Sequence, residues 1–277
     1  MHDTEAFRNF FASLITANVA GPGKEALKEA FASTPREEFL GEGPWKVFSP
    51  AGYIETPSRD PAFLYQDILF VLQEKGTINN GQPSLHAHCL AALDIKKGED
   101  IVHIGAGTGY YTAVLSKLTG PAGSVRAYEI EATLAERATR NLKDYTNVNV
   151  YSQSGSGVAL SACDVIYVNA GATAPLDSWL DALRPGGRLL FPLTGAKGGG
   201  AMLLVTQTSQ SNVFPARFLN RVMFVECSGA RDDETARQLS EVFKSRDDLG
   251  EVRSLRRKTP PDDTCWFAGT DWWLSTR

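Results

Sequence analysis

Cysteine, methionine and histidine are scarce in this sequence. Its 277 residues include four cysteines, three methionines and four histidines, and no two cysteines form a C-x-x-C pair. This pattern argues against a zinc cage and against a dense disulfide framework. A chain of this length buries a sizeable core without such support. We therefore expect no metal site and a reducing compartment, the cytoplasm.

A basic excess and long apolar runs are also missing. The formal net charge is −4, whereas nucleic-acid-binding domains carry a strong basic excess or a basic stripe. No stretch approaches the ~18 apolar residues of a membrane span. Asp3 and Glu5 stand where a secretory signal requires basic residues. We expect no nucleic-acid partner, no membrane contact and no targeting segment.

An amphipathic pattern lies near the N-terminus. Apolar residues recur at i, i+3, i+4, i+7 and i+8, which is the spacing of one helix face. We expect this face to be buried in the core, although a membrane or partner helix shows the same pattern. From Gly41 to Asn80 four prolines interrupt every candidate element, which predicts long loops with short strands. The helix face consists of Phe7, Phe10, Phe11, Leu14 and Ile15.

From Ile101 onward, short apolar runs alternate with helical patterns. The runs IVHIG, SVRAYEI and VNVYS are separated by YYTAVLSKL and ATLAERATRNL, which gives βαβαβ order. Two later runs, DVIYVNA and RLLFPL, continue the series as buried strands. This order is typical of a parallel, doubly wound sheet.

A glycine-rich turn links the first of these strands to the first helix, in VHIGAGTGYYTAVL. Gly105, Gly107 and Gly109 let a ligand approach the backbone, and the helix N-terminus adds free N–H donors. Dinucleotide enzymes need G-x-G-x-x-G, but Tyr110 stands at the sixth position. The spacing G-x-G-x-G favours S-adenosylmethionine over NAD. A tight turn without any ligand is the remaining alternative.

An acidic residue ends the next strand. Glu129 follows the glycine turn by about 20 residues, where a carboxylate accepts hydrogen bonds from both hydroxyls of a ribose. Taken alone, this residue is equally well a solvated strand end. The succession of strand, turn, helix, strand and carboxylate favours a ribose-containing cofactor.

Several further segments match one family. TPREEFL (Thr34–Leu40) is similar to a PRE-F segment, LYQD (Leu64–Asp67) to a Y-x-D segment, and ALRPGGRLLFPL to a late LKPGGRL-P strand. IGAGTGYYTAVLSKL is similar to the first motif of the same family. Over roughly residues 8–226 the sequence resembles the protein-L-isoaspartate O-methyltransferases, which are class I S-adenosylmethionine-dependent methyltransferases.

The resemblance implies an α/β fold with a doubly wound, mostly parallel seven-stranded methyltransferase sheet. It implies an N-terminal helical and loop cap at 1–85, a cofactor-binding core at 86–226 and a C-terminal extension at 227–277. The implied cofactor is S-adenosylmethionine, with S-adenosylhomocysteine as product, and the implied acceptor is an isoaspartyl-type carboxylate of a protein or peptide. The cofactor-binding residues that it implies are His103, Gly105, Ala106, Gly107, Thr108, Gly109, Glu129, Ile130, Gly155, Ser156, Asn169 and Gln82.

Three positions depart from the family pattern. His103 stands where this class usually carries the Asp or Glu that holds the methionine amino group, and Ser156 replaces the acid of a Gly-Asp-Gly motif. In the T-I-S-x-P segment, which is TINNGQP at 77–83, the family serine falls on Asn79 or on Gly81, depending on the alignment. The chain is accordingly a carboxylate methyltransferase, a small-molecule methyltransferase, or a non-catalytic member that acts through interaction.

Other residues have structural and functional interpretations. His86 and His88 would serve as bases for an amine or hydroxyl acceptor, but their i, i+2 spacing points them to opposite sides of a helix and disfavours a metal site. The basic run from Arg253 to Lys258 is predicted to be a solvated edge strand rather than a grip for an acidic partner. Packing, rather than an aromatic cap over a pocket, is predicted for Trp266, Trp272 and Trp273.

Overall fold

The structure is a computed structural model, which describes residues 4–73, 78–208, 212–246 and 248–277. The chain forms two compact units. Unit 1 comprises Met1–Asp100 and Ala106–Gln153, and unit 2 comprises Ile101–Gly105 and Ser154–Arg277. Thr77, the first residue of the TINNGQP segment, lies outside the described residues. The three-segment organisation expected from the sequence stays a prediction.

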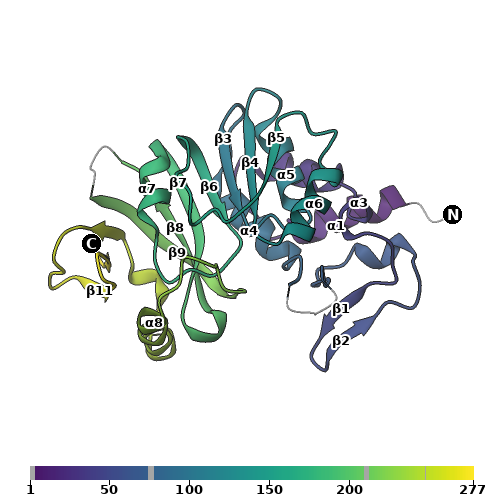
Figure 1. The fold of residues 1–277 in the computed structure, drawn as a ribbon. Helices are drawn as coiled ribbons and strands as arrows, with labels where there is room; N and C mark the ends of the chain where they lie inside the picture. The colour runs from purple at the N-terminus through teal and green to yellow at the C-terminus, as the bar shows by residue number, and fades with distance from the viewer. Residues whose placement is uncertain (1–3, 74–77, 209–211, 247) are drawn as a thin grey trace. The chain divides into compact units, whose positions relative to one another are not determined.

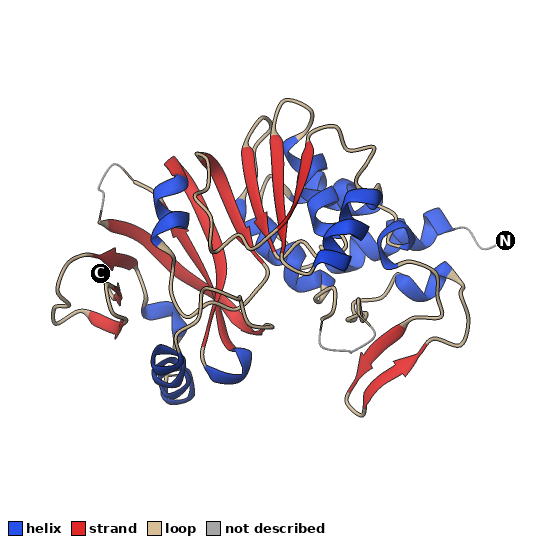
Figure 2. Cartoon of the chain, in the orientation of Figure 1, coloured by secondary structure: helices blue, strands red, loops and turns tan. Residues whose placement is uncertain are grey.

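Unit 1 is mainly helical. Its two longest strands, β4 (Ser124–Glu129) and β5 (Val148–Ser152), form a parallel pair. The described part of the region from Gly41 to Asn80 consists of loops with short elements, as predicted, among them the antiparallel hairpin of β1 (Lys46–Ser49) and β2 (Gly52–Glu55) (Figure 2) and a 3-10 turn. The remaining elements are α1 (Thr4–Ile15), α2 (Lys24–Ala32), α3 (Glu37–Leu40), η1 (Pro61–Leu64), α4 (Pro83–Leu93), α5 (Tyr110–Thr119) and α6 (Ala132–Asn141).

The N-terminal helix buries a narrower stripe than its sequence pattern predicts. Helix α1 packs against α2, η1 and α4 along Phe11 and Ile15, which are buried. Phe7, Phe10 and Leu14 are 37%, 67% and 50% exposed, so the expectation that they belong to the core is wrong. For Phe10 and Leu14 the reason is geometric: the buried line i, i+4 runs through Phe11 and Ile15, and residues on its flank remain in solvent. Phe7 continues the buried line but lies in the first turn of the helix.

A buried arginine lies at the start of α3. The guanidinium carbon of Arg36 lies 4.9 Å from the ring centre of Phe11, 5.3 Å from that of Phe70 and 5.4 Å from that of Tyr110. Its three nitrogens have no hydrogen-bond partner among the residues that the structure describes. The aromatic faces attract the cation through their quadrupoles, which offsets part of the cost of burying it. The PRE-F segment is thereby joined to three separate parts of unit 1.

Unit 2 contains a mixed sheet with the strand order β11-β12-β10-β9-β8-β7-β6-β3. Strands β9, β8, β7, β6 and β3 are labelled in Figure 1. Strands β3, β6 and β7 run parallel, and the others pair antiparallel. The α/β fold class is confirmed. The elements are β3 (Asp100–Ile104), β6 (Cys163–Val168), α7 (Asp177–Ala182), β7 (Leu183–Thr194), η2 (Ala196–Gly198), β8 (Gly199–Thr206), β9 (Val213–Met223), α8 (Asp233–Ser245), η3 (Leu249–Glu251), β10 (Ser254–Arg257), β11 (Cys265–Ala268) and β12 (Trp272–Ser275).

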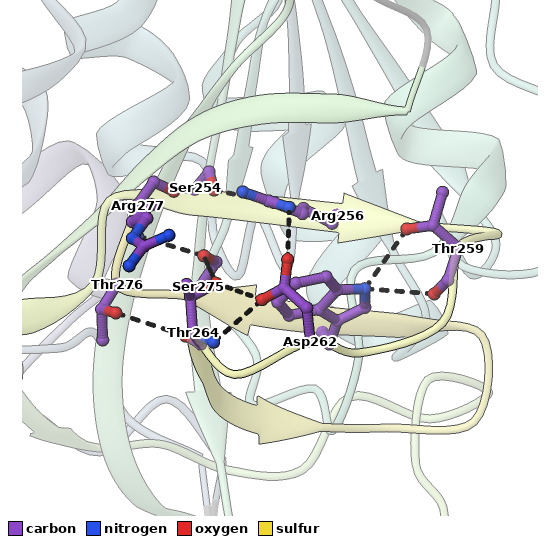
Figure 3. Close-up of polar contacts among 9 residues, drawn as sticks. Ser254, Arg256, Thr259, Asp262, Thr264, Ser275, Thr276 and Arg277 are labelled. Atoms are coloured by element: carbon purple, nitrogen blue, oxygen red, sulfur yellow. Dashed lines mark hydrogen bonds and ion pairs between the residues drawn. The ribbon is translucent and has the colours of Figure 1, made fainter.

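The C-terminal extension continues this sheet. Strand β10 lies between β9 and β12, so the prediction of a solvated edge strand from Arg253 to Lys258 is wrong. Arg257 is buried because Asp177 and Asp181 on α7 hold its guanidinium at 3.0 and 2.5 Å. Arg256 binds the Asp262 carboxylate, which also accepts hydrogen bonds from Thr264 (Figure 3). The predicted packing role is confirmed for the buried tryptophans Trp266, Trp272 and Trp273.

None of the helices within the described ranges is long and apolar enough to cross a membrane.

Candidate functional site

The glycine turn of unit 1 is held open by backbone hydrogen bonds. The Ala106 N–H donates to the Tyr128 carbonyl at 3.1 Å, and the Gly109 N–H donates to the Ala106 carbonyl at 3.0 Å. Gly107 and Gly109 have φ values of +59° and +95°, which favour glycine. A Cβ at Gly109 would lie 2.7 Å from Leu142 Cδ1. Glycine at 107 and 109 therefore lets the turn take this shape at the N-terminus of α5, and the N–H groups of Ala106 and Gly109 are used inside unit 1.

Glu129 lies at the carboxyl end of β4 and contacts this turn. Its Oε2 accepts a hydrogen bond from the Gly107 N–H at 2.7 Å, and its Oε1 accepts one from the Glu131 N–H at 2.9 Å. The side chain is buried, and desolvation raises the pKa of the carboxyl above its usual value. A carboxylate has about four acceptor sites, so Glu129 retains capacity to accept from a ribose besides its backbone donors. The neighbouring Ile130 is half exposed.

The segment that aligns with the family serine lies before α4. Asn79 Oδ1 accepts the Gly81 N–H at 2.9 Å, and a Cβ at Gly81 would lie 2.2 Å from the Nε2 of His86. A serine at position 81 of this chain would therefore displace His86, and the alignment of the family serine with Asn79 or Gly81 stays a prediction. The Gln82 amide donates to Asp67 at 3.1 Å and to Ser84 at 3.2 Å, so its amide N–H groups are used inside the unit.

The two histidines of α4 face different surroundings. His86 is buried and stacks on Tyr111 with ring centres 3.7 Å apart, whereas His88 is exposed. Their predicted separation on the helix is confirmed. Within the described ranges, no group of three or more His, Cys, Asp or Glu side chains is arranged to hold a metal ion.

In unit 2 three predicted residues come together at the ends of β3 and β6. His103 is fully buried, and its Nε2 lies 2.8 Å from the Asn169 Nδ2. Desolvation lowers the pKa of His103 to about 3, so the imidazole is neutral near pH 7. Gly105 has a φ of +77°, and a Cβ there would lie 3.3 Å from the Asn169 carbonyl oxygen.

The loop that contains Gly155 and Ser156 is fixed from two sides. The Trp179 indole N–H donates to the Gly155 carbonyl at 3.0 Å, and a Cβ at Gly155 would lie 2.7 Å from Ile104 Cγ1. The Ser156 hydroxyl donates to the Ser228 carbonyl at 2.6 Å. Ser156 therefore contacts a residue of the C-terminal extension, which no sequence motif indicated.

The residues around Ser228 are themselves held in place. The Cys227 N–H donates to the Gly171 carbonyl at 2.9 Å, and the Gly171 N–H donates to the Val225 carbonyl at 2.7 Å. The Arg231 guanidinium donates to Thr194 Oγ1 at 2.7 Å. Residues 225–231 thus form a strap across the segment that follows β6, and the strap carries Ser228 to Ser156.

Gly229 offers a test of this strap. It has a φ of +82°, and a Cβ there would lie 2.6 Å from Ser156 Oγ, whereas Gly186 has a φ of +81° and open space around it. Because the family resemblance implies that Ser156 contacts the cofactor, we expect Gly229→Ala to lower the affinity for S-adenosylhomocysteine about tenfold, since the Ser156 loop must shift. Gly186→Ala carries the same backbone strain, about 1–2 kcal/mol, and should leave the affinity unchanged. Calorimetric titration measures both, and equal affinities in the two variants would contradict the expectation.

The parallel strands, the glycine turn and the acidic residue at the end of the next strand define the class I methyltransferase fold. A solved protein-L-isoaspartate O-methyltransferase shares this fold, with a TM-score of 0.66 over 86% of this chain and 69% of that chain, at 24% identity. A Plasmodium falciparum structure named as a beta-aspartate methyltransferase, in complex with S-adenosyl-L-homocysteine, gives a TM-score of 0.64. The match covers 83% of this chain and all of the other chain, at 16% identity.

Sequence comparison identifies the family. The model of the protein-L-isoaspartate(D-aspartate) O-methyltransferase family matches residues 13–232. The chain belongs to this family.

Curated relatives carry the same name, protein-L-isoaspartate O-methyltransferase. The protein from Brucella anthropi is 30% identical over 73% of this chain and 84% of its own length. The one from Methanothermobacter thermautotrophicus is 31% identical over 74% of this chain and 88% of its own length. The one from Thermotoga maritima is 32% identical over 60% of this chain, and the match spans half of that protein. The family extends to residue 232, so most of the C-terminal extension lies beyond it.

Proposed function

We propose that this chain is an S-adenosylmethionine-dependent methyltransferase that transfers a methyl group to an isoaspartyl-type carboxylate of a protein or peptide. The observation that carries the proposal is the contact between Glu129 and the Gly107 N–H, because it joins a ribose acceptor to an open glycine turn. Family membership supplies the reaction type and the acceptor class. We further propose that the protein acts in the cytoplasm and has no nucleic-acid partner, in keeping with its net charge of −4.

The residues of each unit fit parts of the cofactor. In unit 1, Glu129 would hold the ribose hydroxyls, and the backbone of Ala106, Gly107, Thr108 and Gly109 would line the cofactor, with Ile130 beside the ribose and Gln82 nearby. In unit 2, His103, Gly105 and Asn169 would lie toward the amino-acid part, and Gly155 and Ser156 toward the adenine. The orphaned Oδ1 of Asn169 supports this fit, because a buried acceptor requires a donor.

The chain's own contribution to the reaction is placement. The cofactor supplies a methyl group on a sulfonium. A carboxylate acceptor is ionised at pH 7, so no general base is required. The buried His103 and the stacked His86 are consistent with this, because neither is presented as a base. Alignment of the reacting groups contributes up to ~7–11 kcal/mol in favourable cases. Asn79 would border the acceptor in place of the family serine.

A small-molecule acceptor is the second candidate. The strap of residues 225–231 binds the Ser156 loop, which is assigned to the adenine, so the strap does not by itself choose between the two acceptors. The direct test is a titration with S-adenosylhomocysteine, followed by methyl transfer from labelled S-adenosylmethionine to an isoaspartyl peptide and to its aspartyl counterpart. We expect micromolar binding and label on the isoaspartyl peptide alone. Absence of binding at millimolar ligand would overturn the proposal, and binding without peptide labelling would favour the small-molecule acceptor.

A further inference from the structure

Asn169 carries an oxygen that has nothing to bind. The residue follows β6 directly, and its N–H donates to the Ile104 carbonyl at 2.8 Å. Its side-chain Oδ1 is buried and has no hydrogen-bond partner among the described residues. Buried polar atoms in native proteins are nearly always paired, so an orphaned acceptor points to a donor that a ligand brings.

His103 determines which way the amide of Asn169 points. The amide nitrogen offers only N–H groups, so the contact at 2.8 Å requires an unprotonated Nε2 on the imidazole. The ring is fully buried and lies nearly parallel to the ring of Tyr167, its register partner on β6. Burial lowers the pKa of His103 to about 3, which keeps the imidazole neutral across the working pH range, with its proton on Nδ1 when Nε2 accepts. In the structure the amide nitrogen faces His103 and the oxygen is turned away from it.

The orphaned oxygen belongs to the part of unit 2 where ligands bind in this fold. Gly105 and Asn169 follow the carboxyl ends of the neighbouring parallel strands β3 and β6, and such strand ends form the ligand crevice of open α/β sheets. A Cβ on Gly105 would lie 3.3 Å from the Asn169 backbone and 3.5 Å from its Cβ. A ligand that approaches the first glycine of the turn therefore also meets Asn169.

We propose that Asn169 Oδ1 accepts a hydrogen bond from the α-ammonium of S-adenosylmethionine, and that His103 is a positioning residue that orients the amide for it. The inference rests on the proposed function, which already assigns the ribose to Glu129 and the adenine to the Gly155–Ser156 loop. The ammonium is the cofactor's remaining strong donor, and an amide oxygen is a good neutral acceptor for it. Asn169 and His103 together thus provide a neutral, oriented acceptor in place of the carboxylate that this class usually carries at position 103.

The test compares two ligands that differ in the amino-acid part, which carries the ammonium. S-adenosylhomocysteine carries the amino-acid part, and 5′-methylthioadenosine lacks it. We expect Asn169→Leu to weaken S-adenosylhomocysteine binding at least tenfold and to leave methylthioadenosine binding within twofold. His103→Phe should weaken S-adenosylhomocysteine binding three- to tenfold, because the Asn169 amide loses its orientation. It should leave methylthioadenosine binding unchanged. Asn169→Asp should restore binding of S-adenosylhomocysteine, since its carboxylate keeps an acceptor at the same place.

A matched control comes from β9. Asn220 also has a buried Oδ1 without a partner among the described residues, but it lies in the middle of an antiparallel strand rather than at a carboxyl end. Asn220→Leu should leave both affinities unchanged. Equal losses for the two ligands in Asn169→Leu, or no loss for S-adenosylhomocysteine, would overturn the inference. Failure of the unaltered protein to bind S-adenosylhomocysteine would instead overturn the proposed function. Thermal melting of each variant verifies folding, and Asn169→Asp decides the matter if the leucine variant is unfolded.

Discussion

Glu129→Ala is expected to lower the affinity for S-adenosylhomocysteine by roughly 10²–10⁴-fold, because two hydrogen bonds to a charged group are worth about 1.5–3 kcal/mol each. The same change frees the Gly107 N–H, which loses its acceptor at 2.7 Å and so loosens the turn. Calorimetric titration measures the effect. The control is Glu131→Ala, because this exposed neighbour donates only its backbone N–H to Glu129. A loss below about fivefold, some 1 kcal/mol, would contradict the assignment of the ribose to Glu129.

The pH dependence of Glu129 follows from its burial. Desolvation raises the pKa of this carboxyl in the folded protein above 4.5. The folded state therefore retains this proton more readily than the unfolded chain does. This group alone stabilises the ligand-free protein below the pKa of the unfolded chain, and that stability is lost as pH rises through the higher pKa of the folded protein. Ligand binding has the opposite dependence, because the ionised carboxylate accepts the ribose hydroxyls better. Titrations at falling pH should show weakening affinity in the unaltered protein, and Glu129→Gln should lack that dependence.

Trp179→Ala is expected to destabilise the protein by about 3–5 kcal/mol, the range for removal of a large aromatic side chain from a core. Trp179 is fully buried, and its ring meets Phe191 edge-on with centres 6.0 Å apart. Its indole N–H also donates to the Gly155 carbonyl at 3.0 Å. Urea unfolding measures the loss in free energy of unfolding. A loss under about 1.5 kcal/mol would show that the surrounding side chains fill the cavity left by the indole.

Trp179→Phe separates the packing role of this residue from its hydrogen bond to the Gly155 loop. Trp179→Phe keeps an aromatic ring but leaves the Gly155 carbonyl without its donor, so we expect a measurable loss of S-adenosylhomocysteine affinity as well as of stability. Trp266→Phe is the matched control, since Trp266 is also buried and its indole N–H has no partner among the described residues. That variant should leave ligand affinity unchanged. Equal affinities in the two phenylalanine variants would exclude a role of Trp179 in holding the loop.

The site residues that the sequence predicted lie close together along the chain. The strand, the turn at Gly105–Gly109 and the helix follow one another directly, so their spacing alone indicates the loop, and Glu129 falls at the end of the next strand. The fold class followed from the same alternation. The residues that it missed owe their position to tertiary contacts: Ser228 reaches Ser156 from 72 residues away, and the Trp179 indole binds Gly155.

Burial was the other property that the pattern did not determine. An arginine in a PRE-F segment gives no sign that three aromatic rings will surround it, because those rings come from α1, from residue 70 and from α5. Likewise, the basic run near Arg257 has the composition of an exposed strand. Two aspartates on α7, some 76–80 residues away, neutralise that arginine and allow the strand to lie inside the sheet.

The neutrality of His103 has a consequence for turnover. S-adenosylmethionine carries a positive sulfonium that the product lacks, so each negative charge in the site favours cofactor over product. Two unit charges about 5 Å apart interact by about 3 kcal/mol at an effective dielectric constant near 20. A site with a neutral imidazole in place of a carboxylate forgoes much of that preference. We therefore expect stronger product inhibition than in relatives that keep the acid, so that methyl transfer follows the ratio of cofactor to product rather than the cofactor concentration alone.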